Sequence, residues 1–109
     1  MKKWEKLQWY ITEKINEVYD CGAKPTKGSG NGPTDKGDVS NPYFMVECKL
    51  RNTKDVTIKI DVWEKNKAEL PINSTRVPMM ALENKNGKRF IVLDPEDFFE
   101  ILKEAKDGK

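Results

Sequence analysis

The sequence predicts an α/β fold in which a mixed central sheet of about five strands is flanked by helices. Three observations predict it: an apolar helical period near the start, alternating apolar runs in the middle, and a capped amphipathic helix near the end. The predicted order is helix, three strands, helix, two strands, helix. A chain of 109 residues is expected to form one domain, residues 1–109, around a single core.

The first predicted element is a helix from about Lys3 to Tyr19. Its apolar residues recur at steps of three and four and so share one face. They are Trp4, Leu7, Ile11, Ile15 and Val18. At 100° per residue, Gln8 falls within this face and Glu13 points nearly opposite. The apolar face is expected to lie across the sheet.

A strand is predicted where the chain alternates between apolar and charged residues. One face would carry Phe44, Val46, Cys48 and Leu50, and the other Met45, Glu47, Lys49 and Arg51. The run Ser40-Asn41-Pro42-Tyr43 just before it favours a turn, which would bring Asp38 back beside Glu47.

Asp38, Glu47 and Lys49 together indicate phosphodiester hydrolysis with Mg²⁺. Carboxylate oxygens are hard ligands for this ion, and an ammonium can orient the attacking water and offset negative charge on the phosphorane. The alternative is an ordinary charged strand face, on which Glu47 and Lys49 have no chemical task.

The remaining elements follow from alternation and capping. Val56–Ile60 alternates as a third strand, and Asp61 with Glu64 three residues later predicts a capping box for a helix to about Leu70. Residues 76–82 and 89–93 form an apolar hairpin with Asn-Gly near its tip. The last helix would be capped by Asp94, with Pro95 first. Its predicted buried stripe is Phe98, Ile101, Leu102 and Ala105.

Residues 20–38 have the highest density of glycine and proline in the chain, which predicts a long loop with a short edge strand near residues 23–26. In it, Lys27-Gly28-Ser29-Gly30 would let backbone N–H groups approach a phosphate, with Lys27 and Ser29 as donors. The alternative is a flexible linker.

The net charge of +2 comes from 20 basic and 18 acidic residues, so the total says nothing about nucleic acid. Basic residues nevertheless concentrate in the middle of the chain, which favours a local positive surface. The expected DNA contacts are Lys27, Ser29, Lys36, Arg51, Lys59 and Lys65. For Lys65, a solvated helix face is the alternative explanation.

Several classes of site are excluded or unsupported. Without histidine, the chain has no imidazole base and no histidine zinc site. Cys21 and Cys48 have neither a disulfide framework nor metal-ligand spacing. With no signal-peptide core and no membrane-length apolar run, a soluble, cytoplasmic protein without a membrane partner is expected.

Three motifs carry a family resemblance. Asp38 followed by Glu47-x-Lys49 resembles the PD-(D/E)XK nuclease signature, with Gly37 where that family usually has proline. Together with Lys27-Gly28-Ser29-Gly30-Asn31-Gly32 and Lys36-Gly37-Asp38-Val39, the segment Val46-Glu47-Cys48-Lys49 resembles the small archaeal-type and phage-type Holliday junction resolvases. The likeness is strongest over residues 22–51.

The resemblance implies a restriction-endonuclease-like fold and a homodimer that cuts a four-way DNA junction symmetrically. It implies Mg²⁺, with Mn²⁺ as the alternative ion, held by Asp38, Glu47 and the Cys48 carbonyl, with Lys49 positioning the water. In a phage protein the compartment would be the host cytoplasm. The family's first helix contributes a glutamate, whose position Gln8 best fits.

Gln8 departs from that pattern, since an amide adds no charge to a cation site. It would hold a water or a phosphate, or else be a polar residue at the edge of the core. Two further functions therefore stay open: a nuclease of the superfamily acting on other branched or duplex DNA, and a non-catalytic DNA-binding module of the same fold.

Overall fold

The computed structural model describes residues 1–26 and 37–108. In chain order its elements are α1 (Lys3–Tyr19), β1 (Lys24–Pro25), β2 (Val39–Ser40), β3 (Phe44–Leu50), α2 (Ile60–Ala68), β4 (Val77–Glu83), β5 (Arg89–Val92) and α3 (Pro95–Asp107). None of the described helices combines the length and apolar character needed to cross a membrane.

The strands form two sheets instead of the single five-stranded sheet expected from the sequence. The larger sheet has the order β3-β4-β5, with β3 and β4 parallel and β4 and β5 antiparallel. The smaller one pairs β1 with β2 antiparallel. The α/β class is thus confirmed, and the parallel pair is joined by a crossover through α2, as a parallel pair requires.

The chain reverses between β2 of the smaller sheet and β3 of the larger one. The Asn41 side chain accepts hydrogen bonds from the N–H groups of Tyr43 and Phe44 and donates to the carbonyl of Val39, which turns the chain sharply after Ser40. This is the turn predicted from the sequence. It leaves β2 only two residues long.

The predicted strand Val56–Ile60 is wrong. Residues 51–59 contain no strand, and Ile60 begins α2. Val56 and Ile58 are partly buried against the cluster of Trp63, Met80 and Leu82. Their alternation therefore reflects side chains packing over the face of the sheet, while the backbone pairs with no strand.

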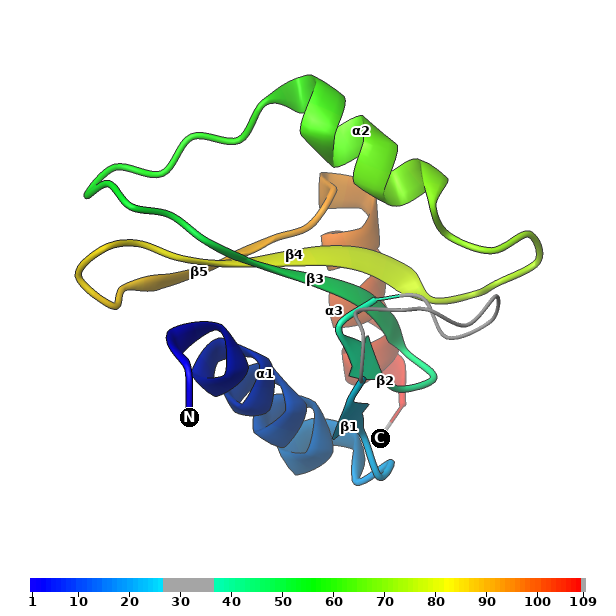
Figure 1. Cartoon of the computed structure of the whole chain (residues 1–109). Coiled ribbons are helices and arrows are strands. Elements are labelled where there is room, and N and C mark those ends of the chain that lie inside the picture. Colours follow the sequence, from blue (N-terminus) through cyan, green and yellow to red (C-terminus); the bar gives the residue numbers. More distant parts are fainter. Residues whose placement is uncertain (27–36, 109) are drawn as a thin grey trace.

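Helix α1 covers one face of the three-stranded sheet, and α2 lies on the opposite side (Figure 1). Leu7, Ile11 and Ile15 pack with residues of β3 and β4, including Val46 and Ala81, in the main core. The predicted helix bounds are confirmed. Val18 does not belong to the buried stripe, because it lies at the C-terminal end of the helix and is 74 % exposed.

The alternation predicted for β3 is mostly confirmed. Phe44, Val46 and Cys48 are buried in the core under α1, while Glu47 and Lys49 lie on the other face. Met45 on that second face is also buried. Leu50, at the strand end, is 36 % exposed and so is not a core residue.

Helix α2 begins two residues earlier than predicted. Its N-cap is Lys59, which makes no side-chain capping bond, and Asp61 lies within the first turn. The predicted Asp61 capping box is therefore wrong, although an acidic side chain there still complements the helix dipole. Trp63 fixes the helix on the sheet by packing against Met80 and Leu82.

The hairpin of β4 and β5 and the start of α3 follow the prediction. Gly87, in the connection, has a φ of 84°. Asp94 is the N-cap of α3 and Pro95 follows it, but the Asp94 carboxylate does not cap the helix. It accepts hydrogen bonds from Trp63 Nε1 at 2.9 Å and Lys67 Nζ at 2.8 Å, and so ties α3 to α2.

The predicted buried stripe on α3 is wrong. No residue of this helix is buried, and Phe98, Phe99 and Leu102 are 44 %, 64 % and 48 % exposed. Ile101 alone of the predicted stripe packs, partly buried, against the main core. The helix is amphipathic, as the sequence indicates, yet most of its apolar side meets no other described element.

Candidate nuclease site

Asp38 lies against the free edge of β3. Its backbone N–H donates to the Val46 carbonyl at 2.6 Å, and its carboxylate Oδ2 accepts the Cys48 N–H at 2.6 Å. The residue is 2 % exposed. These two bonds link Asp38, the residue just before β2, to β3 and place the Asp38 carboxylate next to the strand that carries Glu47, as the sequence predicts.

Gly37 explains why this approach is so close. Its φ is +101°, and a Cβ built on it would lie 2.9 Å from the Val46 carbonyl oxygen and 3.1 Å from the Val46 nitrogen. Proline, with φ fixed near −65°, cannot adopt this conformation. A glycine at position 37 is thus required by the local backbone.

Gln8 holds the backbone of Asp38 in place. From the sheet-facing side of α1, its amide nitrogen donates to the Asp38 carbonyl at 2.5 Å and to the Thr26 carbonyl at 3.2 Å. Gln8 is 4 % exposed, and Glu13 is exposed. The predicted rotation of α1 is confirmed. Gln8 meets Asp38 at its main-chain carbonyl.

Glu47 and Lys49 lie two residues apart on the face of β3 that turns towards α2. Lys49 Nζ is 3.6 Å from Glu47 Oε2. Burial raises the pKa of the Glu47 carboxyl above its usual range, the negative charges of Asp38 and Glu69 raise it further, and Lys49 opposes the change. The site therefore concentrates negative charge that a cation would relieve.

Cys48 contributes its backbone and not its thiol. Its carbonyl oxygen accepts a hydrogen bond from Trp4 Nε1 at 3.1 Å. Burial, with the charges of Asp38 and Glu47, raises the pKa of the thiol to about 12, so the sulfur stays protonated and is a poor metal ligand at neutral pH. A carbonyl has two lone pairs, so the Trp4 bond leaves one for a cation.

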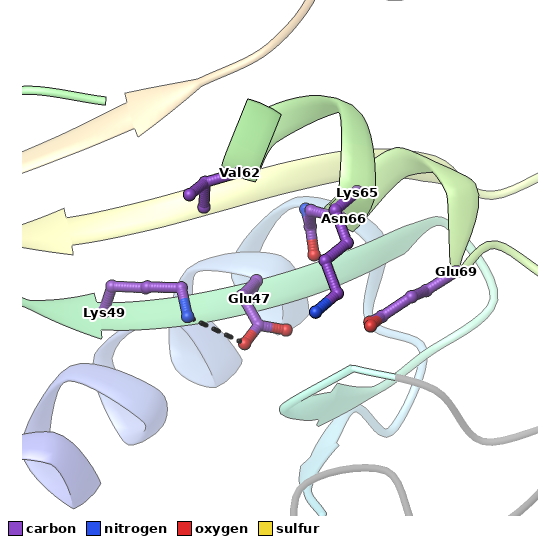
Figure 2. A pocket seen from close by; sticks show the side chains of 6 residues that line it. All are labelled: Glu47, Lys49, Val62, Lys65, Asn66 and Glu69. Carbon is purple, nitrogen blue, oxygen red and sulfur yellow. Dashed lines mark ion pairs between the residues drawn. The ribbon is translucent and has the colours of Figure 1, made fainter. Parts of the chain in front are cut away.

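A cavity of about 280 Å³ lies between β3 and α2, next to this site (Figure 2). It is lined by Glu47, Lys49, Val62, Lys65, Asn66 and Glu69. The α2 members recur at steps of three and four and so share one helix face. Asn66 and Glu69 were not predicted as site residues from the sequence. A helical projection of α2 would have grouped them with Lys65, but it would not have shown that this helix face lies opposite Glu47.

The other residues predicted to contact DNA lie in different places. Lys27, Ser29 and Lys36 lie outside the described residues. Lys65 lines the cavity. Arg51 and Lys59 do not line it: the Arg51 N–H donates to the Glu83 carbonyl at 2.8 Å, and Lys59 is the exposed N-cap of α2.

The donor set fits Mg²⁺ better than a transition metal. Two carboxylates and one backbone carbonyl are hard oxygen ligands, and Mg²⁺ is commonly bound by one or two carboxylates with water completing the shell. In the described part of the chain, no group of three or more histidine, cysteine, aspartate or glutamate side chains is placed to hold a metal. A site built from these residues would thus rely on Asp38, Glu47 and the Cys48 carbonyl.

Comparison of the chain with protein-family models, with curated proteins and with solved structures found no match. A function for this site therefore has to be argued from its residues and their arrangement.

Proposed function

We propose that this chain is a Mg²⁺-dependent DNA endonuclease of the restriction-endonuclease-like fold that cuts four-way junctions. The observation that carries the proposal is the Asp38 carboxylate bound to the Cys48 N–H, which places it next to the raised-pKa carboxyl of Glu47. A carboxyl whose pKa is raised by burial and further by the charge of a second carboxylate is typical of a cation site.

The residues divide the work as follows. Asp38, Glu47 and the Cys48 carbonyl would hold Mg²⁺, which supplies Lewis-acid stabilisation of charge on the phosphate. Lys49, on the same face as Glu47, orients the attacking water and offsets the negative charge that grows on the phosphate oxygens. Gln8 fixes the Asp38 backbone, so it acts on the chemistry through Asp38.

DNA as the substrate is supported by two cationic side chains, Lys49 and Lys65, beside the carboxylates. Mn²⁺ is the alternative ion. A homodimer fits the twofold symmetry of a four-way junction. The exposed apolar side chains Phe98, Phe99 and Leu102 of α3 offer a surface that such a dimer would bury.

The test is a gel assay of the purified protein on a labelled four-way junction with Mg²⁺, with nicked, flapped and linear duplexes alongside. Paired symmetric cuts in the junction, abolished by a chelator, are expected. Cutting of the other substrates with equal efficiency would replace the junction by a broader structure specificity. Absence of any metal-dependent cutting would reject the nuclease.

A non-catalytic DNA-binding module is the second candidate, and the observation that favours it is Gln8. Its amide nitrogen is directed at backbone carbonyls and adds no carboxylate to the site. Junction binding by the native chain without cleavage in either Mg²⁺ or Mn²⁺ would establish the module.

A further inference from the structure

Helix α3 has an apolar face that no other described element covers. Phe98, Phe99 and Leu102 recur at steps of three and four and so share this face, and they are 44 %, 64 % and 48 % exposed. The rings of Phe98 and Phe99 meet edge to face with their centroids 5.1 Å apart, which forms one aromatic block on the surface. Ile101, to one side of this face, packs against the main core and leaves the aromatic block exposed.

The exposed area of this face is what a small, stable dimer needs. At about 200 Å² for a whole phenylalanine side chain, the exposed parts of Phe98, Phe99 and Leu102 come to roughly 300 Å² in one copy and roughly 600 Å² in two. A stable interface of the smallest class buries about 1,200 Å² in total, and a little more than half of it is apolar. Two copies of this face therefore supply the apolar part of such an interface.

Charged residues of opposite sign border the same face. Glu96 and Lys103 line one surface hollow together with Phe99. Neither of these charges forms an ion pair with another residue in the described ranges. Glu96 lies in the first half of α3 and Lys103 in the second. A second α3 in antiparallel orientation would bring its Lys103 level with Glu96 of the first copy, whereas parallel copies would place each residue level with itself.

We propose that two copies of this chain associate through α3, with the two helices antiparallel about a twofold axis. Phe98 of each copy packs against Leu102 of the other, and Glu96 of each copy pairs with Lys103 of the other. Both contacts place the axis at the level of residues 99 and 100, so one register satisfies them. This inference rests on the homodimer of the proposed function and names its interface.

The interface is connected to the candidate site through α2. Asp94, the N-cap of α3, accepts hydrogen bonds from Trp63 and Lys67 of α2. Helix α2 in turn borders the cavity that contains Glu47. A dimer through α3 thus holds two such cavities at a fixed separation, which paired cuts in one junction require.

Sedimentation equilibrium of the full chain tests the dimer, with a dissociation constant expected in about the micromolar range. Leu102→Glu should raise this constant by at least about a hundredfold, because it places a carboxylate without a partner in the apolar centre of the interface. Ile72→Glu is the matched control. Ile72 is 91 % exposed and lies outside α3, so this change should leave the dissociation constant as it was.

Charge reversal tests the antiparallel register. Glu96→Lys and Lys103→Glu should each raise the dissociation constant by about tenfold, because two symmetric attractions become repulsions. The double variant should return it to within about twofold of the native value, because both pairs form again with exchanged signs. Glu96 is an acid in the first turn of α3, and its loss is common to the single and the double variant, so the rescue reports the pair between the copies.

The outcomes separate this interface from the proposed nuclease. A native chain that stays monomeric at about 100 μM, or a dimer that Leu102→Glu leaves intact, overturns the inference, and junction cutting by the same samples would leave the nuclease in place. Two weakened single variants without rescue in the double variant overturn the antiparallel register. A dimer that shows the rescue but cuts no junction in Mg²⁺ or Mn²⁺ supports this interface and refutes the nuclease.

Discussion

Gly37→Ala should damage the candidate site, because it adds a methyl group where the backbone of residue 37 meets β3. The added Cβ would lie 2.9 Å from the Val46 carbonyl oxygen and 3.1 Å from its nitrogen, and both are backbone atoms that cannot swing aside. The φ of +101° is also outside the region that alanine prefers.

The expected loss of stability combines these two effects. Holding a non-glycine residue at such a φ costs about 1–3 kcal/mol. Forcing a methyl group into a packed contact adds about 1–3 kcal/mol. Gly37→Ala should therefore lower the free energy of unfolding by roughly 2–6 kcal/mol, or else relax by moving Asp38 away from Val46 and Cys48.

Urea unfolding measures the loss, and Gly87→Ala is the matched control. Gly87 has a φ of +84°, but a Cβ there meets nothing within 4 Å, so only the backbone cost of about 1–2 kcal/mol applies. Mg²⁺-dependent cutting is measured on the same samples under conditions where both fold. Equal stability of the two variants would refute the close approach of residue 37 to β3.

Three further outcomes follow from the site. Glu47→Gln should raise the stability of the metal-free protein at neutral pH by up to about 1 kcal/mol, because the raised pKa of Glu47 means that its ionisation destabilises the fold. The gain should vanish below about pH 4, where Glu47 is protonated in both the folded and the unfolded chain. Urea unfolding at a series of pH values measures it. Gln8→Leu should cost about 1–3 kcal/mol, because it removes a buried donor from the Thr26 carbonyl and leaves the Asp38 carbonyl with the Thr26 N–H as its donor. Glu13→Gln should change stability by less than about 0.5 kcal/mol, and equal effects of the two variants in thermal melts would contradict the placement of α1. The pKa of Asp94 is lowered chiefly by its hydrogen bond to Lys67, so the Asp94 carboxylate stabilises the fold above its usual pKa and this contribution is lost as acid protonates it. Asp94→Asn should therefore show a smaller fall in melting midpoint between about pH 5 and pH 2 than the native chain.

The features predicted correctly from the sequence are those marked by a local pattern. The bounds of α1 match because its apolar period corresponds to one buried face, and the positions of β4 and β5 match because Asn86-Gly87 lies between two apolar runs. Gln8 was placed correctly for the same reason: the rotation of α1 is set by Leu7 and Ile11, which are buried on either side of it along the helix.

The features predicted wrongly depend on which other element is present. The alternation at Val56 and Ile58 shows that one side of this segment is partly buried. These side chains pack against the cluster that contains Trp63, and the segment needs no strand partner for this contact. The apolar side chains of α3 predict that one face of this helix is buried, but they do not show which element would bury it. Pattern alone cannot distinguish these cases, since it contains no tertiary contact.

The candidate site was recognised from three residues, and its surroundings were not. Asp38, Glu47 and Lys49 lie close together in the chain, so a turn suffices to join them. Asn66 and Glu69 come from the crossover helix α2 and its C-cap, and the indole of Trp4 that binds the Cys48 carbonyl comes from 44 residues away. No local pattern could connect these residues to the site.

The most direct test of the nuclease site is single-turnover cleavage of a four-way junction by the native chain and by Asp38→Asn. The asparagine keeps an oxygen that can accept the Cys48 N–H, so the fold and junction binding should persist. With its charge removed from the ligand set, Mg²⁺-dependent cutting should fall by at least about a hundredfold. Cutting by Asp38→Asn at close to the native rate would contradict the assignment of this residue to the metal.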